Sequence, residues 1–490
     1  MSYIDNRLVM LRLLHGHGRA AEAIDLTSGA GFRCRSLKRT IDLLSTSHRL
    51  GENHAMGSEV SPKKQFTVAI VGGGIGGLAL AIGLLRRNVP VQIYEAAPAF
   101  RETGLGLSIG PAAHRALPRI DPKLRVTYDS LVTTNADSPG FERFRDTWFE
   151  VVWASGDDEG ELMMDLKALP SGQTTLRRAD FLAALVAMIP DNTAHFDKRL
   201  VSLTERADSV QLSFEDGTTV AADVVVGCDG IKSRVKEFML PEEVEQTRPR
   251  YSGMYCYRAV LEMQDAVTAV GNHRARVATW YIGSGCYAIT YPIMNGKKLN
   301  FGMYKLDEEA WDSDGWVRPG TKEDLDSDMG HMGSYVNALM KYVSDTSQWA
   351  IFEHPPVSSY CRSRVAILGD AAHASTPHQG AGAGQAIEDA LVLAELLADN
   401  AVVTPEDVVA AFRAYDSVRR PRSQKVVTSS KENADLLCLC HEGIRDDGNK
   451  LRQAWNERFQ WLWNLDIDEH IESGRDHLHR HLRNEGGQWS

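Results

Sequence analysis

The sequence predicts an α/β fold, in which a parallel-sheet domain is interleaved with a second domain on a mostly antiparallel sheet and followed by a C-terminal helical tail. Three observations predict it. Residues 66–95 alternate strand, helix and strand signals, the pattern of a parallel βαβ unit. Residues 250–352 carry four strand-like runs in close succession. An apolar strand at 364–368 then returns, followed by a long helix that ends near Ala398.

Length, composition and charge limit the classes of protein to which this chain can belong. A chain of 490 residues is too long for one core, so two or more domains are expected. The composition, with 43% hydrophobic and 24% charged residues, is that of a soluble globular chain. The net charge of −11 argues against nucleic acid or an anionic membrane surface as the main partner. The seven cysteines are scattered, with C-x-C as their only close pair, which favours a reducing compartment and a cytoplasmic location.

The first segment of the chain reads differently from the rest. Residues 1–65 are rich in Arg, His and Ser and lack a sustained strand pattern, so we expect an extension that is disordered or not essential. A transit peptide is one alternative, which four acidic residues before position 43 weaken, and a true start at Met56 is another. The segments expected to fold are the first domain at 66–249 with an insertion from the second near 130–170, the second domain at 250–355, the return of the first at 356–400, and a helical region at 401–490.

One apolar stretch is long enough to cross a bilayer. Residues 66–85 run for twenty positions without a charge. Five glycines cluster at the centre, between a short β-branched strand and a helix rich in Leu and Ala. Because a strand, a glycine turn and a helix explain the whole stretch, no membrane span is expected.

The glycines of this stretch form a nucleotide fingerprint. Gly72, Gly74 and Gly77 have G-x-G-x-x-G spacing after a strand and at the start of a helix. Gly72 would allow the tight turn, Gly74 the approach of a pyrophosphate to the backbone, and Gly77 close helix–strand packing. Glu95 ends the second strand, where a carboxylate meets a ribose, and it would repel a 2′-phosphate. The motif therefore predicts FAD or NAD, and no second fingerprint of this quality follows.

Two later motifs also follow apolar strands. "ADVVVGCDGIKSRVK" places Asp229 and Gly230 after a strand, although alone it suits an ordinary turn in which Asp229 or Ser233 caps a helix. "ILGDAAHASTPHQGAGAG" contains an aspartate, Asp370, and two histidines that could suggest a metal site. We expect Asp370 and the small residues to be functional and the histidines to be structural, so no metal is expected.

Together the three motifs resemble those of single-component FAD-dependent aromatic hydroxylases. The salicylate hydroxylase-like group is the most similar, including fungal members that act on polyketide phenols. "RRADFLAAL" at 177–185, "GAGAGQAIEDA" at 380–390 and "YDSVRRPRSQKVV" at 415–427 are typical of that group. The resemblance extends from about residue 66 to about 470.

The resemblance implies a Rossmann-like FAD-binding domain of the GR2 type and a role for each matching residue. Asp370 would hydrogen-bond the ribityl chain of FAD, and Pro377 would lie beside the reactive edge of the flavin. Backbone N–H groups at Gly380, Gly382 and Ala383 would approach the pyrimidine end of the ring. Reduced flavin carries negative charge there, which a helix N-terminus stabilises.

Three further residues are implied in cofactor binding. Arg178 would reach the flavin, whereas Asp229 and Gly230 would support both nucleotide and flavin binding. The implied enzyme is a monooxygenase that takes NADH or NADPH as co-substrate. It would reduce FAD, form a flavin C4a-hydroperoxide with O2, and deliver oxygen to an electron-rich ring.

The implied substrate is a small phenolic aromatic molecule. Arg258 and Tyr291 lie where fungal members contact such a substrate, and Arg258 could hold a carboxylate or a phenolate. Tyr287 is a further lining candidate, at a position where some relatives carry histidine.

Several alternatives stay open at this point. Oxidative decarboxylation, simple hydroxylation, hydroxylative dearomatisation and epoxidation of a natural-product intermediate would all use the same cofactor. A non-catalytic escort-type protein on the same fold is a second alternative. The sequence is also compatible with a homodimer.

Overall fold

The computed structural model describes residues 62–100, 106–313 and 315–486, and every element below belongs to the unit Ser61–Ser490. The extension predicted for 1–65 therefore lies outside the described residues, apart from its last four positions. In the described part of the chain, no helix has the length and apolarity needed to cross a membrane.

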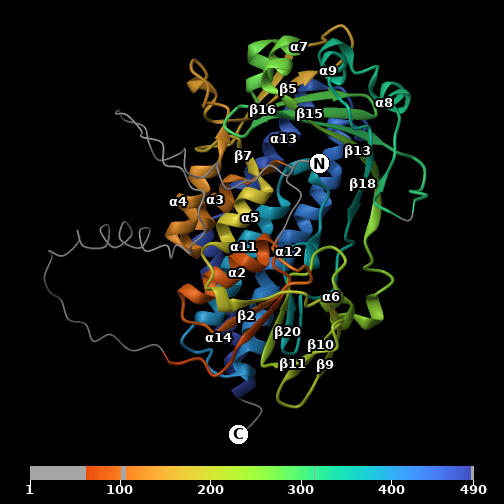
Figure 1. Ribbon diagram of the computed structural model, residues 1–490. Helices are drawn as coiled ribbons and strands as arrows, with labels where there is room; N and C mark the ends of the chain where they lie inside the picture. The colour runs from red at the N-terminus through yellow and green to blue at the C-terminus, as the bar shows by residue number, and fades with distance from the viewer. Residues whose placement is uncertain (1–61, 101–105, 314, 487–490) are drawn as a thin grey trace, which may run out of the picture. The chain divides into compact units, whose positions relative to one another are not determined.

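The first domain is built on a six-stranded sheet with strand order β19-β20-β12-β1-β2-β8. Its strands pair in parallel except β19, which is antiparallel to β20. Their bounds are β1 Val68–Val71, β2 Val91–Tyr94, β8 Ala194–His195, β12 Val224–Gly227, β19 Cys361–Arg362 and β20 Val365–Ile367. Helices α2 (Ile75–Arg86) and α11 (Gly382–Ala398) pack against each other beside this sheet (Figure 1). The predicted parallel α/β architecture is confirmed.

The second sheet has eight strands in the order β17-β18-β13-β16-β15-β14-β5-β6. All its pairs are antiparallel except β14 with β5. The bounds are β5 Thr147–Trp153, β6 Leu162–Lys167, β13 Arg250–Glu262, β14 Thr279–Gly283, β15 Cys286–Ile293, β16 Lys298–Leu306, β17 Val317–Arg318 and β18 Gln348–Glu353. The mostly antiparallel sheet predicted from residues 250–352 is thus present, and β5 and β6 join it from far earlier in the chain. The domain boundaries themselves stay a prediction.

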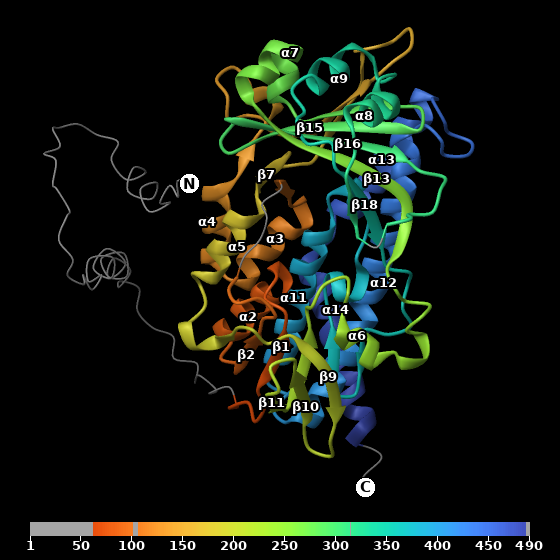
Figure 2. The same cartoon turned by 45° about the vertical axis from the view of Figure 1, so that its right-hand side comes forward.

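Three short helices cover the outer face of the eight-stranded sheet (Figure 2). They are α7 Met263–Arg276, α8 Lys322–Met329 and α9 Gly333–Met340. The strand-like patterning of 250–352 did not predict them, because α8 and α9 have only eight residues each, too few for a sustained apolar period. α7 is longer but is interrupted at Gly271, where φ is +80°.

The remaining elements are two small sheets and five helices of the described residues before α11. Two three-stranded antiparallel sheets have the orders β11-β10-β9 and β3-β7-β4. Their strands are β3 Gly106–Ser108, β4 Thr133–Thr134, β7 Thr174–Arg177, β9 Leu200–Glu205, β10 Val210–Phe214 and β11 Thr219–Ala222. The helices are α3 Pro111–Ile120, α4 Pro122–Leu131, α5 Arg178–Val186, α6 Arg234–Met239 and α10 Asp370–His373.

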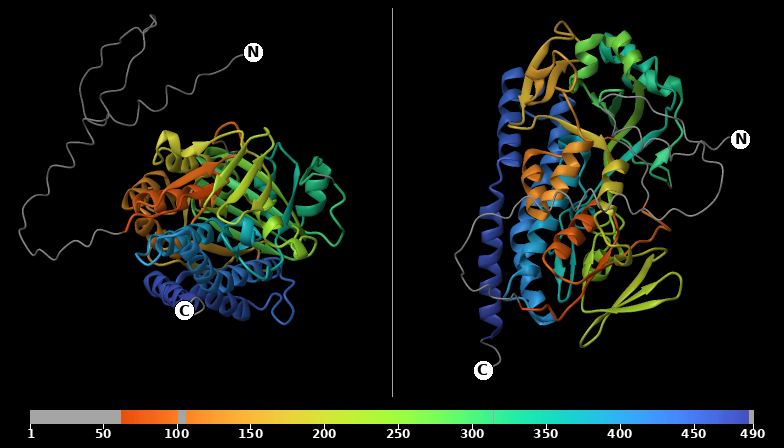
Figure 3. Two further views of the ribbon diagram at one scale, coloured as in Figure 1. Left: turned by 90° about the horizontal axis from the view of Figure 1, so that it is seen from below. Right: turned by 60° about the vertical axis from the view of Figure 1, so that its left-hand side comes forward.

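The C-terminal region is helical, as predicted. It consists of α12 Pro405–Leu437, α13 Gly448–Trp463 and α14 Ile467–Gly486 (Figure 3). Thr404 and Asp407 form a capping box at the start of α12, which satisfies N–H groups that the first turn leaves unpaired. Trp455 and Phe459 on α13 are buried against Trp280 of the eight-stranded sheet.

A buried ionic network joins α10, α11 and α12. The Arg419 guanidinium donates to Asp389 at 2.7 Å and to Glu388 at 2.8 Å, and all three side chains are fully buried. The other oxygen of Asp389 accepts from the Gly369 N–H at 3.0 Å and lies 2.5 Å from His373 Nε2. Burial acts to raise the pKa of Asp389, but the charges of His373 and Arg419 outweigh it and hold that pKa below its usual value. The carboxylate is therefore ionised in the fold.

We predict that Arg419→Met destabilises the protein by about 3–5 kcal/mol, because it leaves two buried carboxylates without their shared cation. Arg420→Met is the control, since Arg420 is more exposed and pairs with Asp416 on the same helix. The control should cost no more than roughly 1 kcal/mol. Urea unfolding of the two variants and the wild type measures both values. Equal unfolding free energies for the two variants would contradict the assigned role of the network.

Candidate active site

Two helices begin at one cavity between the sheets. The cavity has a volume of about 440 Å³, and both the start of α2 (Gly74–Gly76) and the start of α11 (Ala381–Ala383) line it. No described side chain caps either helix. Because the first N–H groups of a helix lack intrahelical partners, both ends offer donors and a positive dipole end to the cavity. Such an arrangement suits an anionic or carbonyl-rich ligand.

The fingerprint glycines are shaped by close packing around this first helix. Gly72 has a φ of +103°, and a Cβ there would lie 2.4 Å from the carbonyl oxygen of Cys228. A Cβ on Gly77 would lie 2.2 Å from the Gly72 carbonyl oxygen, whereas one on Gly74 would point into open space. Glu95 accepts hydrogen bonds from the N–H groups of Gly73 at 2.7 Å and Ala97 at 2.8 Å, at the end of β2. Gly74 alone of the predicted fingerprint residues lines the cavity.

The motif at 229–230 has a structural part and a cavity-lining part. The Asp229 carboxylate accepts from Ser233 Oγ at 2.6 Å and from the N–H groups of Arg234 and Val235 at the start of α6. Burial raises the pKa of Asp229 from its ordinary value, against the opposing effect of these bonds. Gly230, at a φ of +76°, lines the cavity. The side chain of Asp229 is therefore directed to α6, and its neighbours Cys228 and Gly230 line the cavity.

The segment after β20 forms the floor of the cavity. Asp370, Pro377, Gly380, Gly382 and Ala383 all line it. Asp370 and Pro377 are exposed to the cavity, and Asp370 forms no hydrogen bond or ion pair with any residue that the structure describes. Gly380 has a φ of +62°, which reverses the chain before α11 begins.

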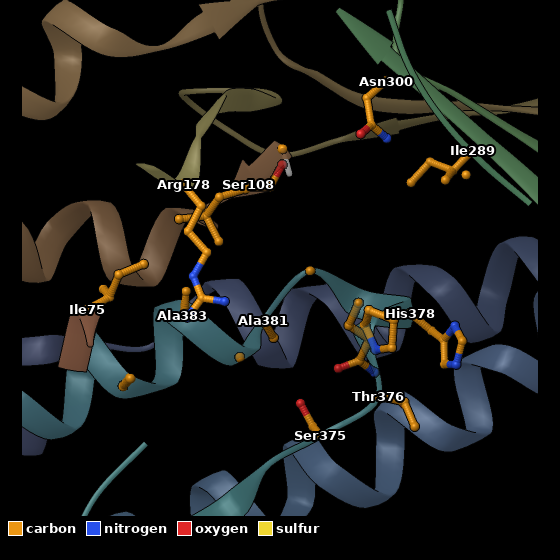
Figure 4. Close-up of a pocket in the computed structure, with 18 of the residues that line it drawn as sticks. Ile75, Ser108, Arg178, Ile289, Asn300, Ser375, Thr376, His378, Ala381 and Ala383 are labelled. Atoms are coloured by element: carbon orange, nitrogen blue, oxygen red, sulfur yellow. The ribbon is translucent and has the colours of Figure 1, made fainter. Parts of the chain in front are cut away.

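The side chain of Arg178 extends from α5 toward this floor. It is the first residue of α5 and lines the cavity. Figure 4 shows its guanidinium extending toward Ala383, at the start of α11. The side chain thus brings a positive charge to the same place as the N–H groups of the helix.

The two histidines of the floor segment are held by hydrogen bonds to protein groups. His373 contacts Asp389, as described above, and His378 Nδ1 lies 2.7 Å from the Tyr287 hydroxyl. Burial lowers the pKa of His378 to about 3 and raises that of Tyr287 well above its usual value. Both members of the pair are therefore neutral at pH 7. Within residues 62–100, 106–313 and 315–486, no cluster of His, Cys, Asp and Glu is arranged to hold a metal ion.

The eight-stranded sheet forms the roof, and it carries both residues predicted to contact substrate. Arg258 Nε donates to Cys256 Sγ at 3.2 Å, and its guanidinium lies 5.0 Å from the centre of the Trp349 ring. Tyr291 donates weakly to the Gly106 carbonyl oxygen at 3.4 Å. Burial raises the pKa of Tyr291 above its usual value, so its hydroxyl stays protonated at neutral pH. Of the fourteen residues predicted for the site, all line the cavity except Gly72, Gly77, Glu95 and Asp229.

Several lining residues were not predicted as site residues. Trp148 Nε1, Gln173 Oε1, His378 Nε2 and Gln379 Nε2 are buried at the cavity without a hydrogen-bond partner among the described residues. Asn300, on β16, also lines it. The alternation of side chains along β16 could have predicted that Asn300 and Tyr304 share one face of the sheet. No local sequence pattern identifies Gln173 as a lining residue, because it follows a loop. A polar ligand in the cavity would give these four atoms hydrogen-bond partners.

The residues present fit a flavin nucleotide. A cavity with two uncapped helix starts, a nearby arginine and unpartnered polar atoms offers donors for phosphates and for the carbonyl groups of a ring. Trp148, Phe149 and Trp280 supply flat apolar surface on the roof.

Comparison with known proteins agrees with this geometry. A family described as "FAD binding domain" matches residues 171–430. A protein named 6-methylsalicylate 1-monooxygenase, from Aspergillus terreus, is 40% identical over 412 residues, covering 82% of this chain and 90% of its own length. A salicylate hydroxylase from Pseudomonas putida is 35% identical over 425 residues, covering 84% and 95%.

A solved structure supports the same assignment. A structure titled "Salicylate hydroxylase substrate complex" has a TM-score of 0.75 and 32% identity to this chain. The match covers 84% of this chain and 98% of that one. The predicted resemblance is confirmed: the chain belongs to the FAD-dependent aromatic monooxygenases of the salicylate hydroxylase type, and FAD is its cofactor.

Proposed function

We propose that the protein uses NAD(P)H and O2 to hydroxylate a phenolic aromatic acid, which Arg258 binds as an anion. One observation carries the proposal: Arg258 lines the cavity and forms no salt bridge with any carboxylate of the described chain. A guanidinium is charged at all physiological pH values. A cation that lines a cavity without a protein anion favours a ligand that brings one.

The cofactor would be held by residues that line the cavity, together with Glu95 and Asp229, which lie outside its lining. Glu95 would bind the ribose and the start of α2 at Gly74 the pyrophosphate, while Asp370 would bind the ribityl chain. Gly230 and Pro377 would contact the flavin region, with Asp229 positioning Gly230. When bound, FAD takes electrons from NAD(P)H and, with O2, supplies the oxygen atom that is transferred.

The α11 start would stabilise charge on the flavin. The N–H groups of Gly380, Gly382 and Ala383, together with Arg178, would face the end of the ring that becomes negative on reduction. Gly72 and Gly77 would act indirectly, by permitting the turn and the packing that place Gly74.

The roof residues would prepare the substrate. Arg258 would pair with its anionic group, and the neutral hydroxyl of Tyr291 would donate a hydrogen bond to an oxygen of the ring. The apolar side chains of Trp148, Phe149 and Trp280 would exclude water, which otherwise competes for the activated oxygen.

The alternatives differ in what the substrate becomes. Oxidative decarboxylation, dearomatisation and epoxidation all suit the same cavity, and product mass distinguishes them. The escort-type alternative is set aside, since the relatives are named as enzymes. The choice between NADH and NADPH, the cytoplasmic location and the homodimer stay predictions.

We expect purified protein to be yellow and to oxidise NADH or NADPH faster when a suitable phenolic acid is present. The test is a panel that contains 2-hydroxybenzoate, its 6-methyl derivative, benzoate, phenol and larger polyketide phenols. Oxidation of NADH or NADPH is followed by absorbance, and the mass of each product is measured by mass spectrometry. The proposal fails if no phenol stimulates oxidation above the background rate.

Arg258→Ala should lower kcat/KM for an acidic substrate by about 10- to 100-fold, because a charge-assisted hydrogen bond is lost. Arg250→Ala is the matched control, since Arg250 is exposed, lies on the same strand and does not line the cavity. The control should retain wild-type kinetics. Unchanged kinetics in Arg258→Ala would remove Arg258 from the site.

Gly74→Val should weaken FAD binding by at least about tenfold, since its side chain would enter the open space beside the helix start. Gly448→Ala, at the start of α13, is the control, because a Cβ there meets only ordinary contacts. The dissociation constant is measured by flavin fluorescence on adding FAD to the apoprotein. Wild-type affinity in Gly74→Val would contradict the proposed place of the pyrophosphate.

A further inference from the structure

Strand β16 presents two different faces. Leu299, Phe301 and Met303 belong to the buried core under α7–α9. The alternate residues Asn300 and Tyr304, with Gly302 between them, line the cavity. Successive side chains of a strand point to opposite faces. The position of Asn300 in the strand therefore places its side chain on the cavity side, whichever rotamer it adopts.

The side chain of Asn300 has no partner of its own. It is only 8% exposed, yet its amide forms no hydrogen bond with any residue that the structure describes. The amide atoms of Asn300 are accessible from the cavity, so a ligand bound there can reach them. An apolar side chain of the same size would offer that ligand no hydrogen bond.

The register of the sheet places Asn300 next to the anion site. Arg258 on β13 lies directly opposite Gly302, and Asn300 is two residues further along β16, about 7 Å away along the strand. Gly302 itself has no side chain, and the space above it is bordered by Ile289 on β15 and by the ring of Tyr304 on β16. Tyr291 on β15 lies opposite Asn300, and its hydroxyl is directed to Gly106.

The amide faces the space where a ring would lie. Figure 4 shows Asn300 and Ile289 projecting from the sheet above the segment that carries His378 and Ala381. Ile289 gives that space an apolar neighbour, and Asn300 gives it a group that can both donate and accept a hydrogen bond.

We propose that Asn300 is a specificity-determining residue of this pocket, which hydrogen-bonds the ortho-hydroxyl oxygen of a 2-hydroxybenzoic acid whose carboxylate is bound by Arg258. The inference rests on the proposed function. It adds that the roof recognises the hydroxyl substituent of the substrate as well as its carboxylate. A site built to hydrogen-bond a hydroxyl discriminates against analogues that lack it, because its own polar group is then left unpaired. Asn300 therefore selects 2-hydroxybenzoic acids over acids without the hydroxyl.

The test compares 2-hydroxybenzoate with benzoate, which differs only by the hydroxyl. Their dissociation constants are measured on the FAD-loaded protein from the change that each ligand causes in the flavin absorbance spectrum. The wild type should bind 2-hydroxybenzoate at least about tenfold more tightly than benzoate, because one additional hydrogen bond contributes about that factor to the affinity. Asn300→Leu, which has similar size but no amide, should reduce this preference to about twofold or less while benzoate affinity is retained.

Two further variants complete the experiment. Met303→Leu is the matched control on the opposite face of β16 and should keep the wild-type preference. Asn300→Ser should lose the preference as Asn300→Leu does, and it provides the result if Asn300→Leu does not fold. A wild-type preference that persists in both Asn300 variants would overturn the inference alone. A wild type that binds 2-hydroxybenzoate no more tightly than benzoate would also overturn it, whereas the proposed function fails separately, if no phenol of the panel stimulates cofactor oxidation.

Discussion

The buried pairing of Arg419 with Asp389 and Glu388 is the interaction on which the geometry of the cavity depends. Asp389 lies on α11, the helix whose start faces the cavity, and the same carboxylate binds the Gly369 N–H. The floor segment therefore cannot shift against the helix without breaking a bond to a buried charge. Arg419 links both to α12. Buried pairs of this kind contribute little net stability, but leaving one member alone is costly, so they favour a single arrangement.

The same network extends to the C-terminal helices. Arg422 donates to Glu388 at 2.7 Å and to the carbonyl oxygen of Leu462 at 3.0 Å, near the end of α13. α13 in turn buries Trp455 against Trp280, which lines the cavity from the roof. The C-terminal region thus connects floor and roof, although it supplies no predicted site residue of its own.

The floor and the roof of the cavity differ in chemistry. The floor offers backbone N–H groups at helix starts, which any sequence can supply provided that small residues let a ligand approach. The roof offers side chains, of which Arg258 and Asn300 are polar and set among aromatic rings. This difference explains why the floor carries short motifs that are visible in the sequence. The roof residues come from strands far apart in the chain, and each is separated from the others by ordinary core residues.

The sequence by itself determined the fold class and the floor, because glycine spacing and strand–turn–helix order are local and have few structural solutions. Gly72, Gly74, Gly77 and the small residues after Asp370 could be recognised from that local pattern. Only the tertiary structure decided how the Asp229 side chain is used, since its helix-capping role was an alternative that the sequence left open. It also decided which residues of β5 and β16 meet at the cavity, because strand order and register depend on pairings between segments more than a hundred residues apart.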